Sequence, residues 1–383
     1  MKFPWKKIRW TNSVFLIGTF TTTVLGVPAY IWHHGLEPFQ VALFVTLVIA
    51  TGLSITLGYH RLFSHLTFRA KWPVKFFTLV CGAAAFEGSA LVWSADHRRH
   101  HKFTDHEDDP HDISKGFFHA HVGWLLFRMG PETPLTWVRD LQKDRLAVWQ
   151  HKYYLPLAFT VGFGLPFLAG LLWGGWTSAL GAILISGAAR IVFVHHMTFC
   201  INSLCHWIGK QPYSSKCTAR DSLIMAFFTF GEGYHNFHHE FQYDYRNGVK
   251  PWQFDPTKWT IWLLQRIGLV DKVRKVPEEV ILKAQIEERK RRLSETLSAR
   301  QAPISESLYA ALHNAQEKMH AALAHWEELL AEYRVAAERR GQISRKHRRE
   351  LKRRVKEATG RLRAAFREWT GAHELIYSAI QTA

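Results

Sequence analysis

Four long apolar segments constrain the fold of this chain more than any other feature of its sequence. They cover about residues 13–32, 39–59, 154–173 and 177–199, and each reaches the roughly 20 residues that a helix needs to cross a bilayer. The links within each pair, HHGLEP and GG, contain no Lys or Arg, whereas the segments at the opposite ends are rich in both. The sequence therefore predicts two transmembrane hairpins with both termini in the cytoplasm.

A fifth apolar run, about residues 74–93, is long enough to cross the membrane but contains Glu87. If it crossed, the phrases HRLFSH (60–65) and DHRRHH (96–101) would lie on opposite faces of the bilayer. We therefore interpret this run as a re-entrant or interfacial helix. Residues 60–152 and 200–383 then share the cytoplasmic face.

The composition agrees with a membrane-bound chain. The 383 residues include 16 Trp and 26 Phe and carry a net charge of +17, which suits contact with anionic headgroups as readily as with nucleic acid. The apolar segments favour the membrane, and we expect no nucleic-acid partner. The four cysteines form no Cys-x2-Cys pair and are too scattered for a disulfide framework or a zinc knuckle.

Three short phrases concentrate histidine on the predicted cytoplasmic face. They span 16 positions, where the average of 23 histidines in 383 residues predicts about one, and they contain eight: His60, His65, His97, His100, His101, His235, His238 and His239. On a helix, residues three or four apart share a face, whereas adjacent residues diverge by about 100°. One His-x2-His-His phrase can therefore reach two neighbouring centres, which favours two metals over one. His206, four residues after Asn202, is a ninth candidate.

The number and type of these ligands restrict the metal. Imidazole binds zinc, copper, iron and nickel, but a structural zinc site takes four ligands and a catalytic one usually three. Nine imidazoles exceed any single zinc site, and zinc has no redox chemistry. Two metals beside an apolar tunnel of membrane helices therefore suggest iron that activates dioxygen against an alkyl chain.

Over about residues 12–270 the chain resembles the membrane-bound fatty acid desaturases, in particular the acyl-CoA (stearoyl-CoA, delta-9) group. The phrases that carry the resemblance are GYHRLFSH, DHRRHHKF, DPHD followed by GFFHAHVGWLL, INSLCHW, GEGYHNFHHEFQYDYRNG and WQFDPTKW. It implies that the nine histidines ligate a di-iron centre and that Asn202 approaches one iron through a water. It also implies a reaction in which dioxygen and two external electrons convert a saturated acyl chain into a cis-unsaturated one, at the delta-9 position.

Two departures from that family leave the acyl carrier open. The animal acyl-CoA enzymes carry an Arg before the second histidine box and an Arg-Lys pair after GWLL, whereas this chain has Ala95 at the first place and Arg128 followed by Met129 at the second. The carrier can then be coenzyme A, a lipid or an acyl carrier protein. The chain has no haem-binding His-Pro-Gly-Gly segment and no ferredoxin cysteine pattern, so we expect a separate donor such as ferredoxin or a cytochrome b-type protein.

Four residues on one face of the second apolar segment are predicted to determine which acyl chain length is preferred. Val48, Gly52, Thr56 and His60 are four residues apart and so lie on one helical face. We expect the Thr56 hydroxyl to bond back to the Gly52 carbonyl, which leaves its methyl group facing the chain. Close packing of helices is the alternative role for Gly52. Trp93 and Arg128 complete the predicted substrate-binding set: Val48, Gly52, Thr56, Trp93 and Arg128.

The sequence predicts a membrane domain over residues 1–274 and a basic helical extension over 275–383. In the extension, small and apolar residues recur at alternating steps of four and three, which is typical of paired helices. Gly341 between the two runs and Pro303 before them predict an antiparallel hairpin, with dimerisation as an alternative use of the seam. The seam residues are Leu308, Leu312, Ala315, Met319, Ala322, Trp326, Leu329 and Tyr333, and Leu351, Val355, Ala358, Leu362, Ala365, Trp369, Ala372 and Ile376.

These observations predict an all-α integral membrane protein with four transmembrane helices and a cytoplasmic helical cap. The cap holds the di-iron site, and the expected activity is that of a fatty acid desaturase. A related di-iron hydroxylase or monooxygenase is the alternative enzyme. A protein that stores or senses metal is the non-enzymatic alternative, and it would consume no dioxygen when acyl substrate and reductant are added.

Overall fold

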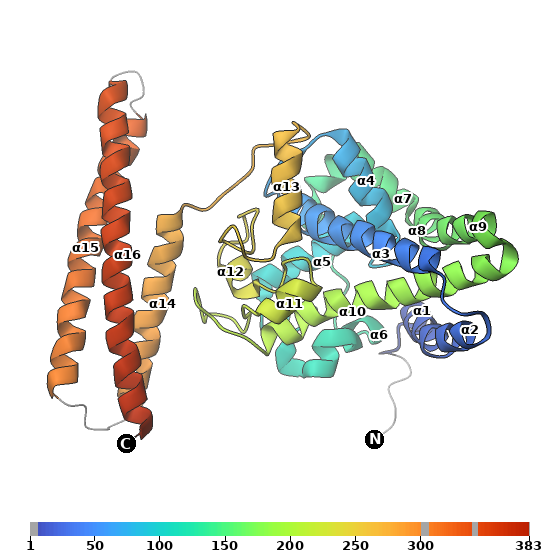
Figure 1. Ribbon diagram of the computed structural model, residues 1–383, viewed down its shortest axis with the longest axis horizontal. Coiled ribbons are helices and arrows are strands. Elements are labelled where there is room, and N and C mark those ends of the chain that lie inside the picture. Colours follow the sequence, from blue (N-terminus) through green and yellow to red (C-terminus); the bar gives the residue numbers. More distant parts are fainter. Residues whose placement is uncertain (1–6, 300–305, 339–343, 383) are drawn as a thin grey trace. The chain divides into compact units, whose positions relative to one another are not determined.

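The computed structural model describes residues 7–299, 306–338 and 344–382, and the chain divides into two compact units, Met1–Val276 and Pro277–Ala383 (Figure 1). Two short strands, β1 (Arg69–Ala70) and β2 (Val270–Asp271), pair antiparallel in the first unit. Its helices are α1 (Trp10–Thr21), α2 (Val27–His34), α3 (Pro38–Leu53), α4 (Trp72–Ala83), α5 (Ala90–Phe103), α6 (Trp124–Leu126), α7 (Arg145–Lys152), α8 (Tyr154–Phe159), α9 (Leu165–Ala182), α10 (Arg190–Asn202), α11 (Leu223–Phe228), α12 (His235–Glu240) and α13 (Pro256–Arg266).

Three continuous helical stretches among the described residues are long and apolar enough to cross a membrane: Trp10–His34, Pro38–Ser64 and Tyr154–His206. The third has 53 residues, more than twice the length that one crossing requires. Its helical geometry breaks at Gly174 and Gly175, and the φ angle of 73° at Gly175 is one that glycine adopts without strain. The chain is thus a mostly helical, integral membrane protein.

Side chains from α10 contact the backbone carbonyls that directly follow the helix α4. This helix has 12 residues and so measures about 18 Å, which is shorter than the hydrocarbon core. The buried Arg190 donates to the carbonyl oxygen of Ala84 at 2.5 Å. Nε2 of His195 lies 2.8 Å from the carbonyl oxygen of Ala85. Carbonyls at a helix end need such partners wherever water is scarce. This contact agrees with our expectation that residues 74–93 do not cross.

A π-helical segment, Ser54–Ser64, completes the second membrane stretch. In a π-helix each N–H donates to the carbonyl five residues back, and here the N–H of His65 donates to the carbonyl of His60 at 3.1 Å. Residues five apart therefore lie on the same face, and the two imidazole centroids are 4.8 Å apart. The segment is buried throughout, so these rings point into the protein interior.

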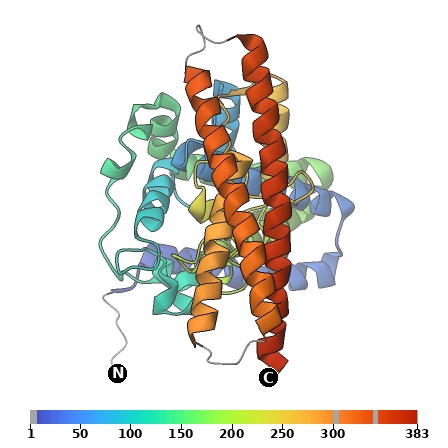
Figure 2. The same ribbon diagram turned by 90° about the vertical axis from the view of Figure 1, so that its left-hand side faces the viewer.

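The second unit contains α14 (Glu278–Ala299), α15 (Glu306–Glu338) and α16 (Arg345–Thr382), which run alongside one another (Figure 2). Its core joins Met319 and Trp326 of α15 to Leu362 and Trp369 of α16, as the heptad pattern predicts, and adds Ile286 of α14. The sequence analysis missed this third helix. Pro303 and Gly341 lie outside the described residues.

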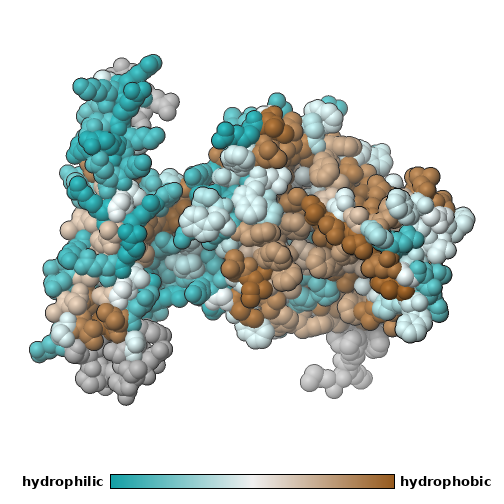
Figure 3. All heavy atoms as spheres, in the orientation of Figure 1, coloured by the Kyte–Doolittle hydropathy of each residue, from teal (hydrophilic) through white to brown (hydrophobic). Residues whose placement is uncertain are grey.

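The surfaces of the two units differ in character (Figure 3). Hydrophobic residues cover much of the visible face of the first unit around α3 and α11, whereas hydrophilic residues dominate the visible face of the second. Exposed Val14, Ile17, Val45 and Leu168 on the membrane stretches contribute to the difference. Their exposure is what lipid contact requires.

Candidate metal centre

Four short segments bring the histidines together from distant parts of the chain. The π-helical segment supplies His60 and leads to His65, α5 supplies three histidines three or four residues apart, and α12 supplies three more with the same spacing. A 3₁₀ turn, Leu204–His206, supplies the last one directly after the third membrane stretch. All nine candidates therefore lie near one end of the membrane-crossing helices.

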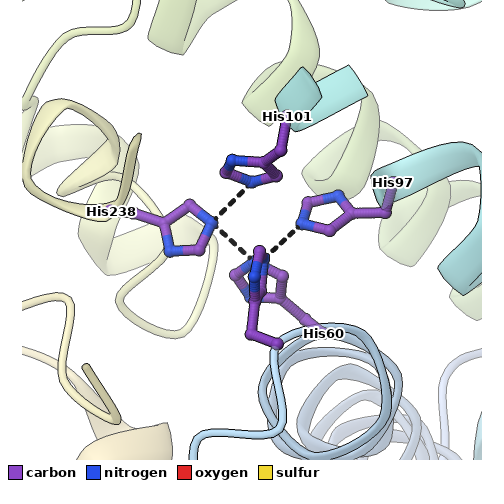
Figure 4. Close-up of side chains that lie close together, drawn as sticks. His60, His97, His101 and His238 are labelled. Atoms are coloured by element: carbon purple, nitrogen blue, oxygen red, sulfur yellow. Dashed lines mark hydrogen bonds between the residues drawn. The ribbon is translucent and has the colours of Figure 1, made fainter. Parts of the chain in front are cut away.

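The first cluster contains five imidazoles, and their ligand atoms lie within 4.8 Å of one another: His60, His65, His97, His101 and His238. Nε2 of His238 lies 3.0 Å from Nε2 of His60 and 2.9 Å from Nε2 of His101. Figure 4 shows the labelled rings pointing toward one common space. Because the nitrogens converge, this cluster has the geometry of a metal site.

The second cluster contains four imidazoles within the same limit: His100, His206, His235 and His239. Nε2 of His235 lies 3.1 Å from Nε2 of His206 and 3.1 Å from Nε2 of His239. Adjacent residues separate as the spacing predicts, since His100 and His239 belong to this cluster and His101 and His238 to the first. The helical phases of α5 and α12 thus divide the histidines between two centres.

Burial makes the charged form of several of these rings unfavourable. Burial, and after it repulsion from neighbouring imidazoles, holds the pKa of His97, His101 and His238 well below the usual value of 6.5. The pKa of His235 and His239 is lowered for the same reasons. A neutral imidazole offers a nitrogen lone pair, which is the form that binds a metal.

A buried ion-pair network supports the first cluster from behind. Nδ1 of His60 lies 2.8 Å from Oε2 of Glu232, and Arg61 donates to Oε1 of the same carboxylate at 2.8 Å. Arg61 also donates to Asp255 at 3.0 Å. Metal-ligating histidines commonly turn their second nitrogen toward a carboxylate in this way, which fixes the ring orientation and the tautomer.

The second cluster has equivalent supports. Nδ1 of His100 lies 2.9 Å from both carboxylate oxygens of Asp109. Nδ1 of His206 lies 2.8 Å from the Thr218 hydroxyl, which donates to Asp105 at 2.6 Å. Burial alone would raise the pKa of Asp109, but the neighbouring His100 holds it below the ordinary value. The Nε2 atoms converge, and Nδ1 of His60, His100 and His206 lies beside a carboxylate or hydroxyl outside the clusters, so the residues of both clusters fit a metal.

A protein-family model described as fatty acid desaturase matches residues 37–262, which include all nine histidines. The chain is 39% identical over 292 residues to a probable acyl-CoA desaturase of Schizosaccharomyces pombe, a match that covers 75% of this chain and 59% of that protein. It is 33% identical over 286 residues to the delta(9)-fatty-acid desaturase fat-6 of Caenorhabditis elegans, covering 73% and 83%. This chain belongs to the fatty acid desaturase family.

The resemblance stated from the histidine phrases is thereby confirmed at the level of the family. A third relative, acyl-CoA desaturase 1 of Saccharomyces cerevisiae, is 36% identical over 305 residues, covering 76% of this chain and 58% of the relative. The chain thus spans less than two thirds of the length of these two yeast relatives. Its family match ends at residue 262 and leaves the three-helix unit unmatched.

A pocket in the first unit borders both clusters, since His60, His97, His100 and His235 line it. Its remaining lining residues are Ile55, Thr56, Trp93, Thr198, Ile201, Asn202 and Glu232. Of the residues predicted from sequence, Thr56, Trp93 and Asn202 therefore lie beside the metal-binding rings. Val48, Gly52 and Arg128 do not line this pocket, and Arg128 is exposed, with its backbone N–H bonded to Lys7.

The expected hydrogen bond of Thr56 is not the one observed. Its hydroxyl is hydrogen-bonded to the hydroxyl of Thr257 on α13 at 2.7 Å, and not to the carbonyl of Gly52. The π-helical segment begins at Ser54 and changes the helical phase there, which the four-residue spacing did not foresee. Gly52 faces the ring of Phe230, because a Cβ atom added there would lie 2.4 Å from it.

Several polar partners of the histidines and of the pocket were not predicted from the sequence. Asp105 and Thr218 reach His206 through loops whose shape no periodicity reveals. Glu87 accepts hydrogen bonds from Trp93 at 3.2 Å and Thr198 at 2.7 Å. Glu87 thus holds two walls of the pocket together.

Removing one shared imidazole tests the first cluster. We expect His238→Ala to lower the metal content of the purified protein by about one ion per chain, because its Nε2 contacts two other ligands. His313→Ala, at an exposed ring in the second unit, is the control and should keep the full content. Elemental analysis after exhaustive dialysis provides the measurement. An unchanged metal content in His238→Ala would contradict the assignment.

Neutralising one supporting carboxylate tests the second cluster. Asp109→Asn removes the negative charge beside Nδ1 of His100, and we expect metal retention to fall about 10- to 100-fold in a titration with chelator. Asp108→Asn is the matched control, since this adjacent carboxylate is exposed and pairs with Arg99. Equal retention in both variants would show that Asp109 does not tune the site.

Proposed function

We propose that this protein is a membrane-bound acyl desaturase that uses dioxygen and two external electrons to introduce a cis double bond at the delta-9 position of a saturated fatty acyl chain. The observation that carries this proposal is the set of nine buried imidazoles, divided into groups of five and four beside one pocket. The names of the relatives, which include acyl-CoA and delta(9)-fatty-acid desaturases, support the reaction and its position.

The ligand set favours two iron ions as the bound metals. Iron bound by imidazoles would supply the oxidising power needed to break an unactivated C–H bond. The chain's own residues hold and orient these ligands: Glu232 aligns His60, and Asp109 aligns His100. Asn202 lines the same pocket, where its amide can hold a water beside the second cluster.

The pocket walls indicate how an acyl chain is placed. Trp93 stacks on His97 with ring centroids 4.8 Å apart, so an apolar chain that contacts the indole lies next to the first cluster. Glu87 accepts from both the indole N–H of Trp93 and the hydroxyl of Thr198, two residues that line the pocket. A chain held between these walls presents a fixed methylene pair to both clusters, which is the requirement for a defined double-bond position.

We further propose four membrane crossings with both termini and the active site in the cytoplasm. The break at Gly174 and Gly175 divides the third apolar stretch into two helices, each with sufficient length. The loops near this break and after His34 contain no Lys or Arg, which favours the outer side for them. The acyl carrier is coenzyme A, a lipid or an acyl carrier protein, and a separate ferredoxin or cytochrome b-type protein supplies the electrons.

We assign residues 1–274 to catalysis and residues 275–383 to a helical extension in which α15 and α16 form an antiparallel hairpin. Met319, Trp326, Leu362 and Trp369 of the seam are buried within the unit of a single chain. The seam is thus already covered, and any homodimer would use another surface.

Product analysis tests the reaction. Expressed in a host that lacks its own desaturase, the chain should yield monounsaturated fatty acids two mass units below their saturated precursors, with the double bond at carbon 9. His97→Ala, which removes a ligand of the first cluster, should yield none. A product heavier by one oxygen would indicate a hydroxylase or monooxygenase, and bound metal without dioxygen consumption would indicate a storage or sensing protein.

Enlarging Gly52 tests the route of the acyl tail. A leucine there would displace the ring of Phe230, which lies within contact of the glycine. If the tail passes this point, Gly52→Leu should shift the products toward shorter chains and leave the double bond at the same distance from the carboxyl end. Gly18→Leu is the control, because no atom lies within 4 Å of a Cβ at that glycine. A uniform loss at all chain lengths would indicate helix packing alone.

Labelling of cysteines in intact cells tests the orientation. An impermeant reagent added outside should label His34→Cys and Trp176→Cys, both at exposed positions. It should not label Glu107→Cys or Tyr243→Cys, which are equally exposed but belong to the proposed cytoplasmic face. The unmodified protein, with its four cysteines buried or half-buried, gives the background. Labelling of Glu107→Cys from outside would mean that residues 74–93 cross the membrane.

A further inference from the structure

The helix α13 buries two polar residues near its start and exposes aromatic residues on its outer face. Thr257 and Lys258 are buried, whereas Trp259 is 41% and Trp262 49% exposed. The buried ammonium group of Lys258 donates to three carbonyls, those of Gly248, Lys250 and Gln253. A surface helix of a soluble protein shows the opposite pattern. The outer face of α13 therefore suits an apolar surrounding.

The neighbouring helix α11 likewise exposes apolar side chains on its outer face. Met225 and Ala226 face inward, and the four remaining side chains of the helix, Leu223, Ile224, Phe227 and Phe228, are between 48% and 71% exposed. The two outer faces are joined through Phe254, whose ring lies 5.0 Å from that of Phe227 and 5.6 Å from that of Trp259. We call these linked outer faces of α11 and α13 the aromatic collar.

The aromatic collar lies where membrane-crossing helices end. The helix α13 packs on the π-helical end of the second membrane stretch, to which the hydroxyl contact between Thr257 and Thr56 ties it. The helix α11 packs on α10, which closes the third membrane stretch. Both contacts place the collar at the level where hydrocarbon gives way to lipid headgroups.

Cationic side chains accompany the tryptophans of this region. The guanidinium of Arg266 lies 5.0 Å from the ring of Trp262, and the ammonium of Lys250 lies 5.5 Å from the ring of Trp252, which is 75% exposed. Tryptophan next to Lys or Arg is characteristic of segments at a membrane interface, where the ring enters the headgroup layer and the cation meets phosphate.

We propose that the aromatic collar is embedded in the lipid interface of the cytoplasmic leaflet, with Arg266 and Lys250 directed to lipid phosphates. The cap over the metal clusters then rests on the bilayer through α11 and α13, in addition to its covalent attachment to the crossing helices. The assignment depends on the membrane stretches and not on the reaction, so it stands or falls independently of the desaturase activity.

Quenching by brominated lipid tests the aromatic collar. Full-length Phe227→Cys and Leu263→Cys, made in a background whose four cysteines are replaced by serine, are labelled with an environment-sensitive fluorophore and reconstituted into phosphatidylcholine vesicles. We expect bromolipid to reduce the emission at both positions to roughly half, and aqueous iodide to have little effect. Glu107→Cys, on an exposed loop, should respond to iodide and not to bromolipid. Ile224→Cys and Trp259→Cys replace any variant that fails to fold.

Two outcomes would overturn the assignment. Quenching by iodide at the collar positions would place them in water. Shielding from both quenchers would mean that a protein surface covers them, either from a second copy of the chain or from another part of it. A shift of the emission toward the blue that appears only in the vesicles, and not in the absence of lipid, would accompany the expected result.

Discussion

Nine imidazoles crowd into a space from which water is largely excluded, and most other features of the protein follow from this constraint. Burial favours the neutral ring, but a neutral ring still needs a partner for its N–H. Asp109 and Thr218 supply such partners for His100 and His206, and Glu232 lies 2.8 Å from Nδ1 of His60. Each of these is fixed in turn, as Glu232 is by the buried Arg61.

Exclusion of water also constrains the membrane part, where backbone carbonyls need hydrogen-bond donors from the protein. The helix α4 ends in an apolar setting, and the guanidinium of Arg190 meets carbonyls that solvent would otherwise hydrate. Lys258 does the same for the loop before α13. These buried cations have no role in the chemistry proposed for the clusters. They allow irregular backbone near the bilayer, and that backbone delivers the histidines to one place.

Much of this arrangement could be predicted from sequence because it repeats locally. The length of the apolar segments predicted the membrane stretches. The spacing in HRRHH and HNFHH predicted that the histidines divide between two groups. The heptad steps gave the contacts of Met319 and Trp369. Each of these signals depends only on residues close together in the chain.

The rest could not be predicted because it depends on contacts between distant segments. The pairing of Thr56 with Thr257 joins residues 201 positions apart, and no pattern in either segment requires it. Asp105 reaches His206 by way of Thr218, across two loops of irregular shape. The third helix of the C-terminal unit, α14, carries only a few apolar contacts such as Ile286, too few to form a periodic stripe.

The π-helical segment Ser54–Ser64 has a consequence for how this part of the protein can evolve. A π-helical hydrogen bond spans one residue more than an α-helical one. Deleting a single residue between His60 and His65 would therefore restore α-helical hydrogen bonding there. Everything beyond the deletion would turn by about 100°, and His60 and His65 would no longer share a face. The number of residues in this stretch is therefore constrained by the two rings it must align.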